Sequence, residues 1–402
     1  MDISGLAMIS ALASSQAAVE PFSQIDWSVE IAADAVISTE PASDAGMTPL
    51  GDVTLDIAGE RIDSAGRRYG LAATVRAQAD SERRGLARQI TPCTVETEAC
   101  SSLPGPAQAG LLTGLHRADL FDDGDSRVAL ESAYAYVKLA YFDVRVGRGE
   151  GAARLEADPL PGAFRLMRAD GPRVDPGGLS IADTANTLST NSAKLTVQSR
   201  RLAGLRASLS YTPEADDCGL DVCRPGPDRA GLAIGEVDDV IEAGLSFDHR
   251  FRTSGQRWTL ALSASQGRAS GEFAANHEDP WAVGARAIWS KGPVSLGAAW
   301  LSSNDGVDDG RYTSWAGSAA YETGPWLSAL ELSWARSDLV EAQGWTAQIG
   351  SSRVFDTGFV AGAGVRHSEL DVDPGPANAG FAAASGRLTA GTLVFAEAGL
   401  RF

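Results

Sequence analysis

The chain has 402 residues, 44% hydrophobic and 21% charged, so it can fold around a core. A formal charge of −18 argues against nucleic acid as a partner, because little basic surface is available to neutralise phosphates. No stretch approaches ~20 consecutive apolar residues, which excludes a membrane-spanning α-helix, and 44 glycines favour β structure with many turns.

Residues 1–18 are predicted to be the remnant of a secretion signal. The apolar stretch 3–13 is followed by small residues at 14–18 that resemble a signal-peptidase site, yet the first basic residue is Arg61. We therefore expect the true start of the signal to lie upstream, or its start codon to be misassigned. The alternative is a natural, frayed N-terminus. Residues 19–402 are expected to form a single domain.

Alternation of apolar and polar residues is the main structural signal in the rest of the chain. Residues 25–31 have apolar side chains at odd positions and polar ones at even positions, and the segments 53–57 and 69–75 repeat this pattern. Such alternation is typical of strands with one wet and one apolar face. It recurs at 127–137, 142–149, 190–199, 204–212, 238–250, 257–268, 281–290, 294–302, 311–322, 326–337, 344–354, 358–369 and 391–402.

The connections between these segments alternate in length. Short ones are expected at 63–68, 200–203, 253–256, 291–293, 323–325 and 355–357, and long ones at 81–126, 150–189, 213–237, 269–280 and 370–390. This pattern predicts an all-β, transmembrane antiparallel β-barrel with short periplasmic turns and long outer loops. About sixteen strands would enclose an aqueous channel. Residues 109–120 could form another strand, but the count would then be odd, so they are assigned to the second long loop.

Aromatic residues near strand ends predict interfacial girdles on the outer, apolar face of the barrel. They are Trp27, Tyr69, Tyr134, Tyr136, Phe142, Trp281, Trp289, Trp300, Tyr312, Tyr321, Trp326, Trp334, Trp345 and Phe359.

Three segments resemble the Gram-negative general porin family. The hairpin 126–149 ends on Gly147-Arg148, the hairpin 191–213 begins with Asn191-Ser192, and the last strand stops at Phe402. Two features depart from the family pattern: Tyr141-Phe142 stands where glycines usually form the tight turn, and the second long loop is extended and carries cysteines. These departures affect the loop contacts rather than the barrel.

The resemblance implies a passive, water-filled pore in the outer membrane of a Gram-negative bacterium. It would carry ions and small hydrophilic solutes, with no catalytic residues. The resemblance further implies a homotrimer that meets through the first strands and the last, with the second long loop reaching across. Expected partners are the lipid bilayer, outer-leaflet lipopolysaccharide and, through Phe402, the barrel-assembly machinery.

The third long loop, residues 150–189, is implied to fold into the lumen as a constriction loop. Its acidic residues would face basic residues of the wall and create a transverse field. The acids are Glu156, Asp158, Asp170, Asp175 and Asp183; the wall bases are Arg76, Arg127, Arg145, Lys194, Arg206 and Arg286. The same loop carries Arg154, Arg165, Arg168 and Arg173, so the sign of selectivity stays open, as does a merely solvated loop.

Acidic residues of inward parity also gather on the first two strands, at Asp26, Glu30, Asp34, Asp52, Asp56 and Glu60. A catalytic carboxylate pair is disfavoured there, because nearly every inward position of a pore is polar. The four histidines are scattered. Two other hypotheses stay open: an outer-membrane barrel enzyme and a non-conducting structural or adhesive barrel.

Four cysteines lie in two of the long loops. We predict two local disulfides, Cys93 with Cys100 in 81–126 and Cys218 with Cys223 in 213–237, rather than a zinc site. No cofactor is expected, apart from a Ca²⁺ ion that acidic loop residues could bind. The candidate groups are Asp122, Asp123 and Asp125, and Asp305, Asp308 and Asp309.

Overall fold

A computed structural model describes residues 25–39, 49–64, 66–79, 107–115, 126–217, 219–220, 232–233, 235–372 and 389–401. Several predictions concern residues outside these ranges. They are the secretion-signal remnant 1–18, the cysteine pairs Cys93–Cys100 and Cys218–Cys223, the acidic group at Asp122, Asp123 and Asp125, and the terminal Phe402.

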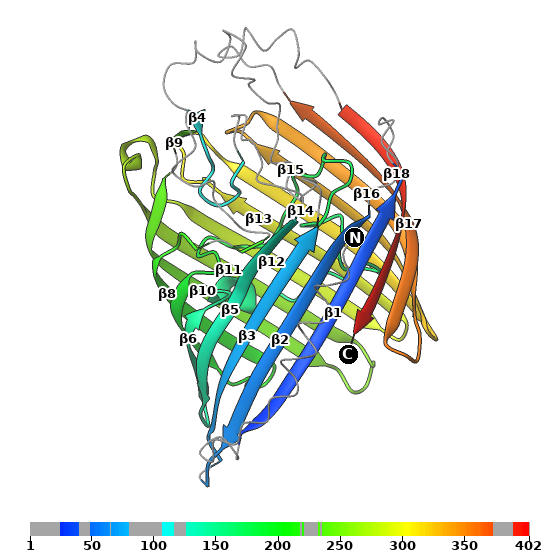
Figure 1. Cartoon of the computed structure of the whole chain (residues 1–402), viewed down its shortest axis with the longest axis horizontal. Helices are drawn as coiled ribbons and strands as arrows, with labels where there is room; N and C mark the ends of the chain where they lie inside the picture. The colour runs from blue at the N-terminus through cyan, green and yellow to red at the C-terminus, as the bar shows by residue number, and fades with distance from the viewer. Residues whose placement is uncertain are drawn as a thin grey trace.

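Sixteen strands form a closed antiparallel barrel (Figure 1), as the alternation predicts. Each strand pairs with its neighbours along the chain, and β1 closes the barrel against β18 from Ala32↔Arg401 to Ser38↔Phe395. The barrel strands are β1 (Asp26–Ser38), β2 (Leu50–Ile62), β3 (Arg68–Ala79), β5 (Ser126–Lys138), β6 (Phe142–Arg148), β7 (Ala193–Ser199), β8 (Leu205–Glu214), β10 (Glu236–Arg250), β11 (Arg257–Ser270), β12 (Trp281–Lys291), β13 (Val294–Ser303), β14 (Tyr312–Thr323), β15 (Trp326–Ser337), β16 (Ala342–Val354), β17 (Phe359–Val372) and β18 (Thr389–Arg401).

The two rims of the barrel differ, as predicted. At one rim the strands are joined by short turns, such as Gly292 with Pro293 and Gly324 with Pro325. Both glycines have positive φ angles, 57° and 56°, which a residue with a Cβ adopts only at a cost. The opposite rim carries the longer connections. There the short strands β4 (Ala107–Gln108) and β9 (Leu232–Ala233) pair in parallel as a separate two-stranded sheet that is not part of the barrel wall (Figure 1).

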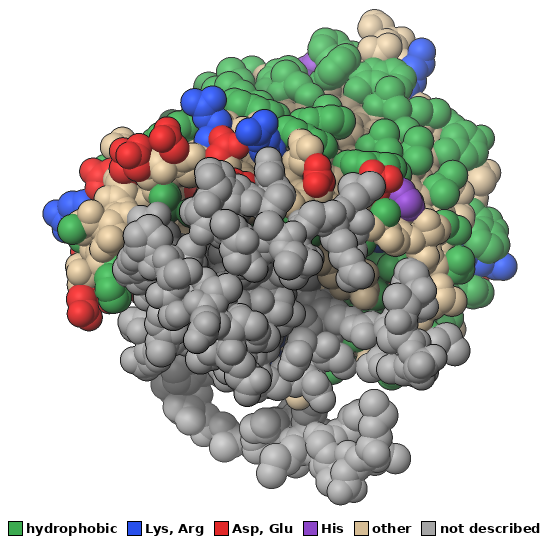
Figure 2. Space-filling view, turned by 90° about the horizontal axis from the view of Figure 1, so that it is seen from above, with side chains coloured by type: hydrophobic (Ala, Val, Ile, Leu, Met, Phe, Trp, Pro, Cys, Tyr) green, Lys and Arg blue, Asp and Glu red, His purple; other side chains and the backbone are tan. Residues whose placement is uncertain are grey.

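Large apolar side chains cover the outside of the barrel (Figure 2). Near the long-loop rim, Trp300, Trp315, Trp334 and Trp345 form a continuous row, because each pairs across to the next strand. A second group lies near the short-turn rim, where Trp258 pairs with Trp289 and the exposed Tyr321 and Trp326 follow on β14 and β15. Two aromatic belts on an apolar wall are the expected outer surface of a transmembrane barrel.

Three aromatic residues expected in these belts instead face the interior. A bulge in β5 near Glu131 shifts the register against β3, so the side chains of Tyr134 and Tyr136 turn inward. The Tyr136 hydroxyl donates a 3.0 Å hydrogen bond to the lumenal Glu60. Tyr312 is 1% exposed and packs in the interior. The sequence-based assignment was therefore wrong for these three residues.

Helical structure is minor. The one-turn helix α2 (Ala152–Leu155) lies in the third long loop and the 3₁₀ turn η4 (Ala274–Asn276) in the β11–β12 connection. Within the described ranges, no helix is long and apolar enough to cross a membrane. Residues 109–115 belong to no barrel strand, in agreement with their assignment to a loop.

Candidate pore constriction

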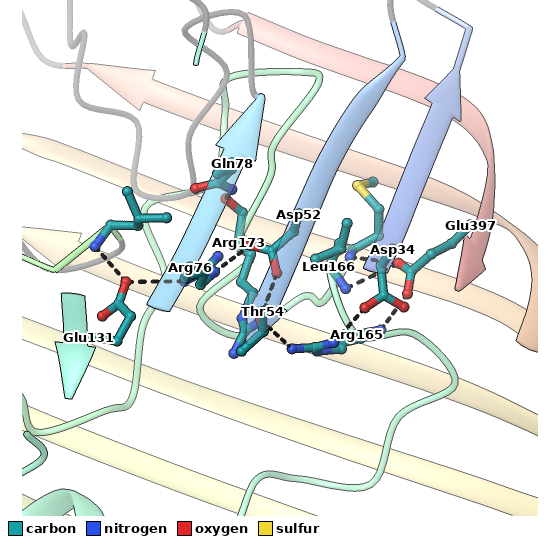
Figure 3. Close-up of polar contacts among 12 residues, drawn as sticks. Asp34, Asp52, Thr54, Arg76, Gln78, Glu131, Arg165, Leu166, Arg173 and Glu397 are labelled. Atoms are coloured by element: carbon teal, nitrogen blue, oxygen red, sulfur yellow. Dashed lines mark hydrogen bonds and ion pairs between the residues drawn. The ribbon is translucent and has the colours of Figure 1, made fainter. Parts of the chain in front are cut away.

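Residues 150–189, the constriction loop, run through the inside of the barrel. The far part of the loop is attached to the last strand by Glu397, a lumenal residue that is 8% exposed. Its carboxylate accepts hydrogen bonds from the backbone N–H groups of Arg165 at 2.7 Å, Leu166 at 3.1 Å and Met167 at 3.0 Å (Figure 3). Three donors on one carboxylate fix the backbone of this segment against the wall.

Neighbouring strands hold the next residues of the loop. Glu331 on β15 accepts a hydrogen bond from the Ala169 N–H at 3.1 Å, and the Ser333 hydroxyl donates to the Ala169 carbonyl at 2.6 Å. Phe164 packs edge-on against Phe395, with 4.7 Å between ring centroids. The loop therefore crosses the lumen to the β15–β18 side and is anchored there by both polar and apolar contacts.

The start and the end of the loop are fixed to the β7–β10 side. Glu156 accepts hydrogen bonds from Gln198 at 2.8 Å, from Arg206 at 2.9 Å and from Ser246. Burial raises the pKa of the Glu156 carboxyl, but these hydrogen bonds outweigh it and lower the pKa overall. Lys194 donates to the Ser189 hydroxyl at 2.7 Å at the end of the loop.

A cavity of about 600 Å³ remains between the loop and the wall made by β2, β3, β5 and β6. Arginines dominate its lining: Arg76, Arg145, Arg154, Arg165, Arg168, Arg173 and Arg286. The acidic residues of the lining are Glu131, Glu150, Asp170, Asp183 and Glu242. Four of the seven arginines belong to the loop itself.

Carboxylates of the wall stand behind several of these arginines (Figure 3). Arg165 reaches from the loop to Asp34 on β1 at 2.5 Å, and its second terminal nitrogen donates to Thr54 at 2.9 Å. Asp52 on β2 forms a buried ion pair with Arg76 and lies 3.5 Å from Arg173. The acids of the first two strands therefore position guanidinium groups at the edge of the cavity.

Two carboxylates of the loop lie together on the opposite side of the cavity. Asp170 accepts hydrogen bonds from the N–H and hydroxyl of Thr184 at 2.8 and 2.6 Å and lies 3.6 Å from Arg286. Asp183 accepts one from the Ala185 N–H at 2.7 Å. Burial, together with the nearby Asp170 charge, raises the pKa of Asp183 to about 7.

The structure brings part of the predicted charged set together. Asp170, Asp183, Arg76, Arg145 and Arg286 line the cavity, whereas Glu156, Lys194 and Arg206 fix the base of the loop. Asp175 accepts the Ser180 N–H at 2.7 Å and lies 3.6 Å from Arg366. Asp158 is exposed and its carbonyl accepts a hydrogen bond from Arg286, while Arg127 donates to the Leu220 carbonyl away from the cavity.

Sequence reasoning assigned no role to the loop arginines and did not single out the anchors Glu397 and Glu331. Inward parity was the only signal for the two anchors, and it is shared by most polar residues of the strands. Asp305, a calcium candidate, already accepts three hydrogen bonds from Leu112 and Thr113, whereas Asp308 and Asp309 are exposed. Among the described residues, no cluster of three or more His, Cys, Asp or Glu side chains suits a metal ion.

A family model for Gram-negative porins matches residues 5–373 of the chain. The chain is a member of the Gram-negative porin family. Its fold is similar to that of OmpF from Salmonella typhi in a complex with daunomycin, with a TM-score of 0.56 and 11% identity over 94% of this chain and 98% of that one. A refined porin structure matches with a TM-score of 0.51 and 11% identity over 94% and 100% of the two chains. No curated protein matches the sequence.

Membership of the family establishes what this porin does in general terms. It is a passive pore of the outer membrane for small hydrophilic solutes, and it is not an enzyme. The expectations of a general porin and of an outer-membrane location are thereby confirmed.

Proposed function

We propose that the constriction of this porin favours small anionic solutes. The observation that carries the proposal is the excess of guanidinium groups around the cavity, seven against five carboxylates. Arginine side chains are long and donate several hydrogen bonds, so a solute that carries a carboxylate or phosphate meets donors first. The chain as a whole is acidic, so this local excess opposes its net charge of −18.

Two arginines strengthen this argument because no carboxylate of the described residues lies within ion-pairing distance of them, although Arg168 is near enough to Glu331 for an electrostatic interaction. Arg145 lies over the ring of Tyr134 at 5.4 Å, and Arg168 donates to the Leu160 carbonyl at 2.5 Å. Neither forms an ion pair with a carboxylate among the residues that the structure describes. The other five each lie within 4.0 Å of an acidic group, at Asp52, Glu150, Asp34, Asp52 and Asp170 in chain order.

The reversal potential of the purified porin in a planar bilayer with a salt gradient tests the proposal. We expect its sign to show anion preference, and Arg168→Gln to move it toward cations. Arg268→Gln is the matched control, since Arg268 is 61% exposed and pairs with Asp238 and Asp239 away from the cavity. Cation preference of the wild-type pore, or equal shifts for the two variants, would refute the proposal.

We further propose that the porin is a homotrimer. All tryptophans except Trp27 lie on β11 to β16, the side suited to lipid headgroups. On the opposite side, an apolar groove crosses β18, β1, β2 and β3 and is lined by small residues, including Ala33, Ala77 and Ala398. Small side chains allow close approach of a neighbouring barrel. Ala398→Trp should dissociate the trimer on a native gel while the barrel stays folded.

The remaining expectations are also proposals, and most of them concern residues outside the described ranges. The local disulfides Cys93–Cys100 and Cys218–Cys223 can be tested by mass spectrometry of non-reduced peptides. Removal of Phe402 should slow insertion by the barrel-assembly machinery, and N-terminal sequencing of the mature protein would test cleavage near residue 18. Binding of lipopolysaccharide, and of Ca²⁺ by the outer loops, can be measured on the purified porin.

A further inference from the structure

The inner wall of the barrel is apolar at the long-loop ends of several strands. Leu301 on β13, Tyr312 on β14, Ala335 on β15 and Leu370 on β17 all face inward and are almost fully buried. A wall that lined only water would carry polar side chains at these positions. Something must therefore cover this part of the wall.

Two segments provide the cover. One is the end of the constriction loop, with Ile181 and Leu188 in the same apolar cluster. The other is the inserted segment, residues 107–115, which contributes Leu111, Leu112 and Leu115. Leu111 and Leu115 are 1% and 0% exposed, so the segment is packed into the barrel interior as a protein core would be.

Asp305, in the β13–β14 connection, holds the inserted segment in place. Its Oδ1 accepts hydrogen bonds from the N–H groups of Leu112 and Thr113, both at 2.9 Å, and its Oδ2 accepts one from the Thr113 hydroxyl at 2.6 Å. The Asp305 carbonyl accepts a further one from the Leu111 N–H at 2.8 Å. Asp305 is 0% exposed and has a φ of 52°, an uncommon conformation for a residue other than glycine.

Glycines on both sides permit this close contact. A Cβ on Gly110 would lie 2.1 Å from the Asp305 carboxylate, and one on Gly306 would lie 2.4 Å from the Leu111 side chain. The contact thus depends on the detailed fit of two segments that are far apart in the sequence.

We propose that the inserted segment is a second restriction of the pore, fixed by Asp305, which lowers the size limit for solutes that enter from the long-loop rim. The segment lies on the long-loop side of the constriction loop and fills the lumen next to β12–β17. The resemblance predicted that the second long loop reaches toward a neighbouring subunit. Its described part, 107–115, packs inside its own barrel, and the rest of that loop lies outside the described residues.

The test compares Asp305→Ala with the wild-type porin in liposomes, using uptake of neutral sugars from monosaccharide to trisaccharide. Loss of the three hydrogen bonds to the Asp305 carboxylate would shift the balance toward the displaced segment by on the order of 1000-fold. We expect uptake of the trisaccharide relative to the monosaccharide to rise several-fold. Asp308→Ala, an exposed neighbour in the same connection, should leave the ratio unchanged.

A second measurement reports the position of the segment itself. Chymotrypsin should not cleave after Leu111, Leu112 or Leu115 in the wild-type porin, and should cleave there in Asp305→Ala. Should Asp305→Ala fail to give a folded barrel on a heat-modifiability gel, Thr113→Ala removes one of the hydrogen bonds and should shift both readouts in the same direction. The proposal would be overturned if a variant is cleaved but its sugar uptake depends on size as in the wild type, or if the wild-type porin is itself cleaved at these leucines. A wild-type porin that admits no sugar would contradict the pore function instead.

Discussion

Replacement of Glu397 by alanine is the strongest single perturbation of the constriction that the structure offers. The change removes the acceptor of three backbone hydrogen bonds, at 2.7, 3.1 and 3.0 Å, and leaves the N–H groups of 165–167 facing a small cavity. A hydrogen bond to a charged group contributes roughly 1.5–3 kcal/mol, so the three together stabilise the loop position by at most about 4.5–9 kcal/mol. Water from the lumen can reach the vacated site and reduces this figure.

The other contacts of the constriction loop determine how far it moves in Glu397→Ala. Glu331, Ser333 and Gln348 still bind residues 167–169, and Phe164 still packs on Phe395. We therefore expect the loop to stay in the lumen but to move, so single-channel recordings should show frequent transitions between conductance levels. Glu397→Gln keeps an acceptor oxygen and should give a milder effect.

Trypsin supplies an independent readout, because the loop carries Arg165, Arg168 and Arg173. Cleavage there should be faster in Glu397→Ala than in the wild type. Glu30→Ala is the control, since Glu30 is an exposed residue of inward parity on β1. If Glu397→Ala shows no more transitions between conductance levels than the wild type, and is cleaved by trypsin at the same rate, the carboxylate does not hold the loop.

Three further predictions concern the same loop. Burial raises the pKa of Asp183 to about 7, so its carboxyl is ionised above that pH and neutral below it. Anion preference should therefore increase as the pH falls from 8 to 5.5. Asp183→Asn should abolish this pH dependence of the reversal potential. Tyr312→Phe removes a hydroxyl that accepts from the N–H of residue 183 at 2.9 Å and donates to the carbonyl of residue 181 at 2.8 Å; the loss should cost about 1–3 kcal/mol, measured as a lower urea midpoint for unfolding in micelles. Gly151→Ala places a Cβ 1.5 Å from the Glu242 carboxylate, so the start of the loop must shift and the conductance should change. Gly317→Ala, where the nearest atom to the added Cβ is 3.9 Å away, should not alter the conductance.

The barrel could be predicted because each strand has one face in water and one in hydrocarbon, which imposes a strict two-residue period on the sequence. That argument fails where the period is interrupted: the bulge near Glu131 turns Tyr134 and Tyr136 inward, although their parity before the bulge points outward. It also fails for Tyr312, because the interior at that level is packed with protein rather than filled with water.

The path of the constriction loop could not be derived in the same way. Its anchors are distant in the chain: Glu397 binds residues more than two hundred positions earlier, and Asp34 binds Arg165 from the first strand. Parity identified Asp34 and Asp52 as lumenal acids, but it could not show which loop residue each would meet. The charge of the loop was similarly ambiguous, since acids and arginines alternate along it and only the fold decides which of them face the passage.

The division of charge at the constriction follows from how the loop is held. An inserted loop exposes backbone N–H groups to the wall, and carboxylates such as Glu397 and Glu331 are the strongest acceptors that the wall can offer for them. Those acids are then committed to the backbone, and Asp34 and Asp52 are committed to Arg165 and Arg76. The cavity arginines without a carboxylate of the described residues within 4.0 Å are then Arg145 on β6 and Arg168 of the loop. The arginine-lined passage thus follows from the use of the wall carboxylates to hold the loop. Removal of one of these carboxylates should therefore alter ion selectivity as well as gating.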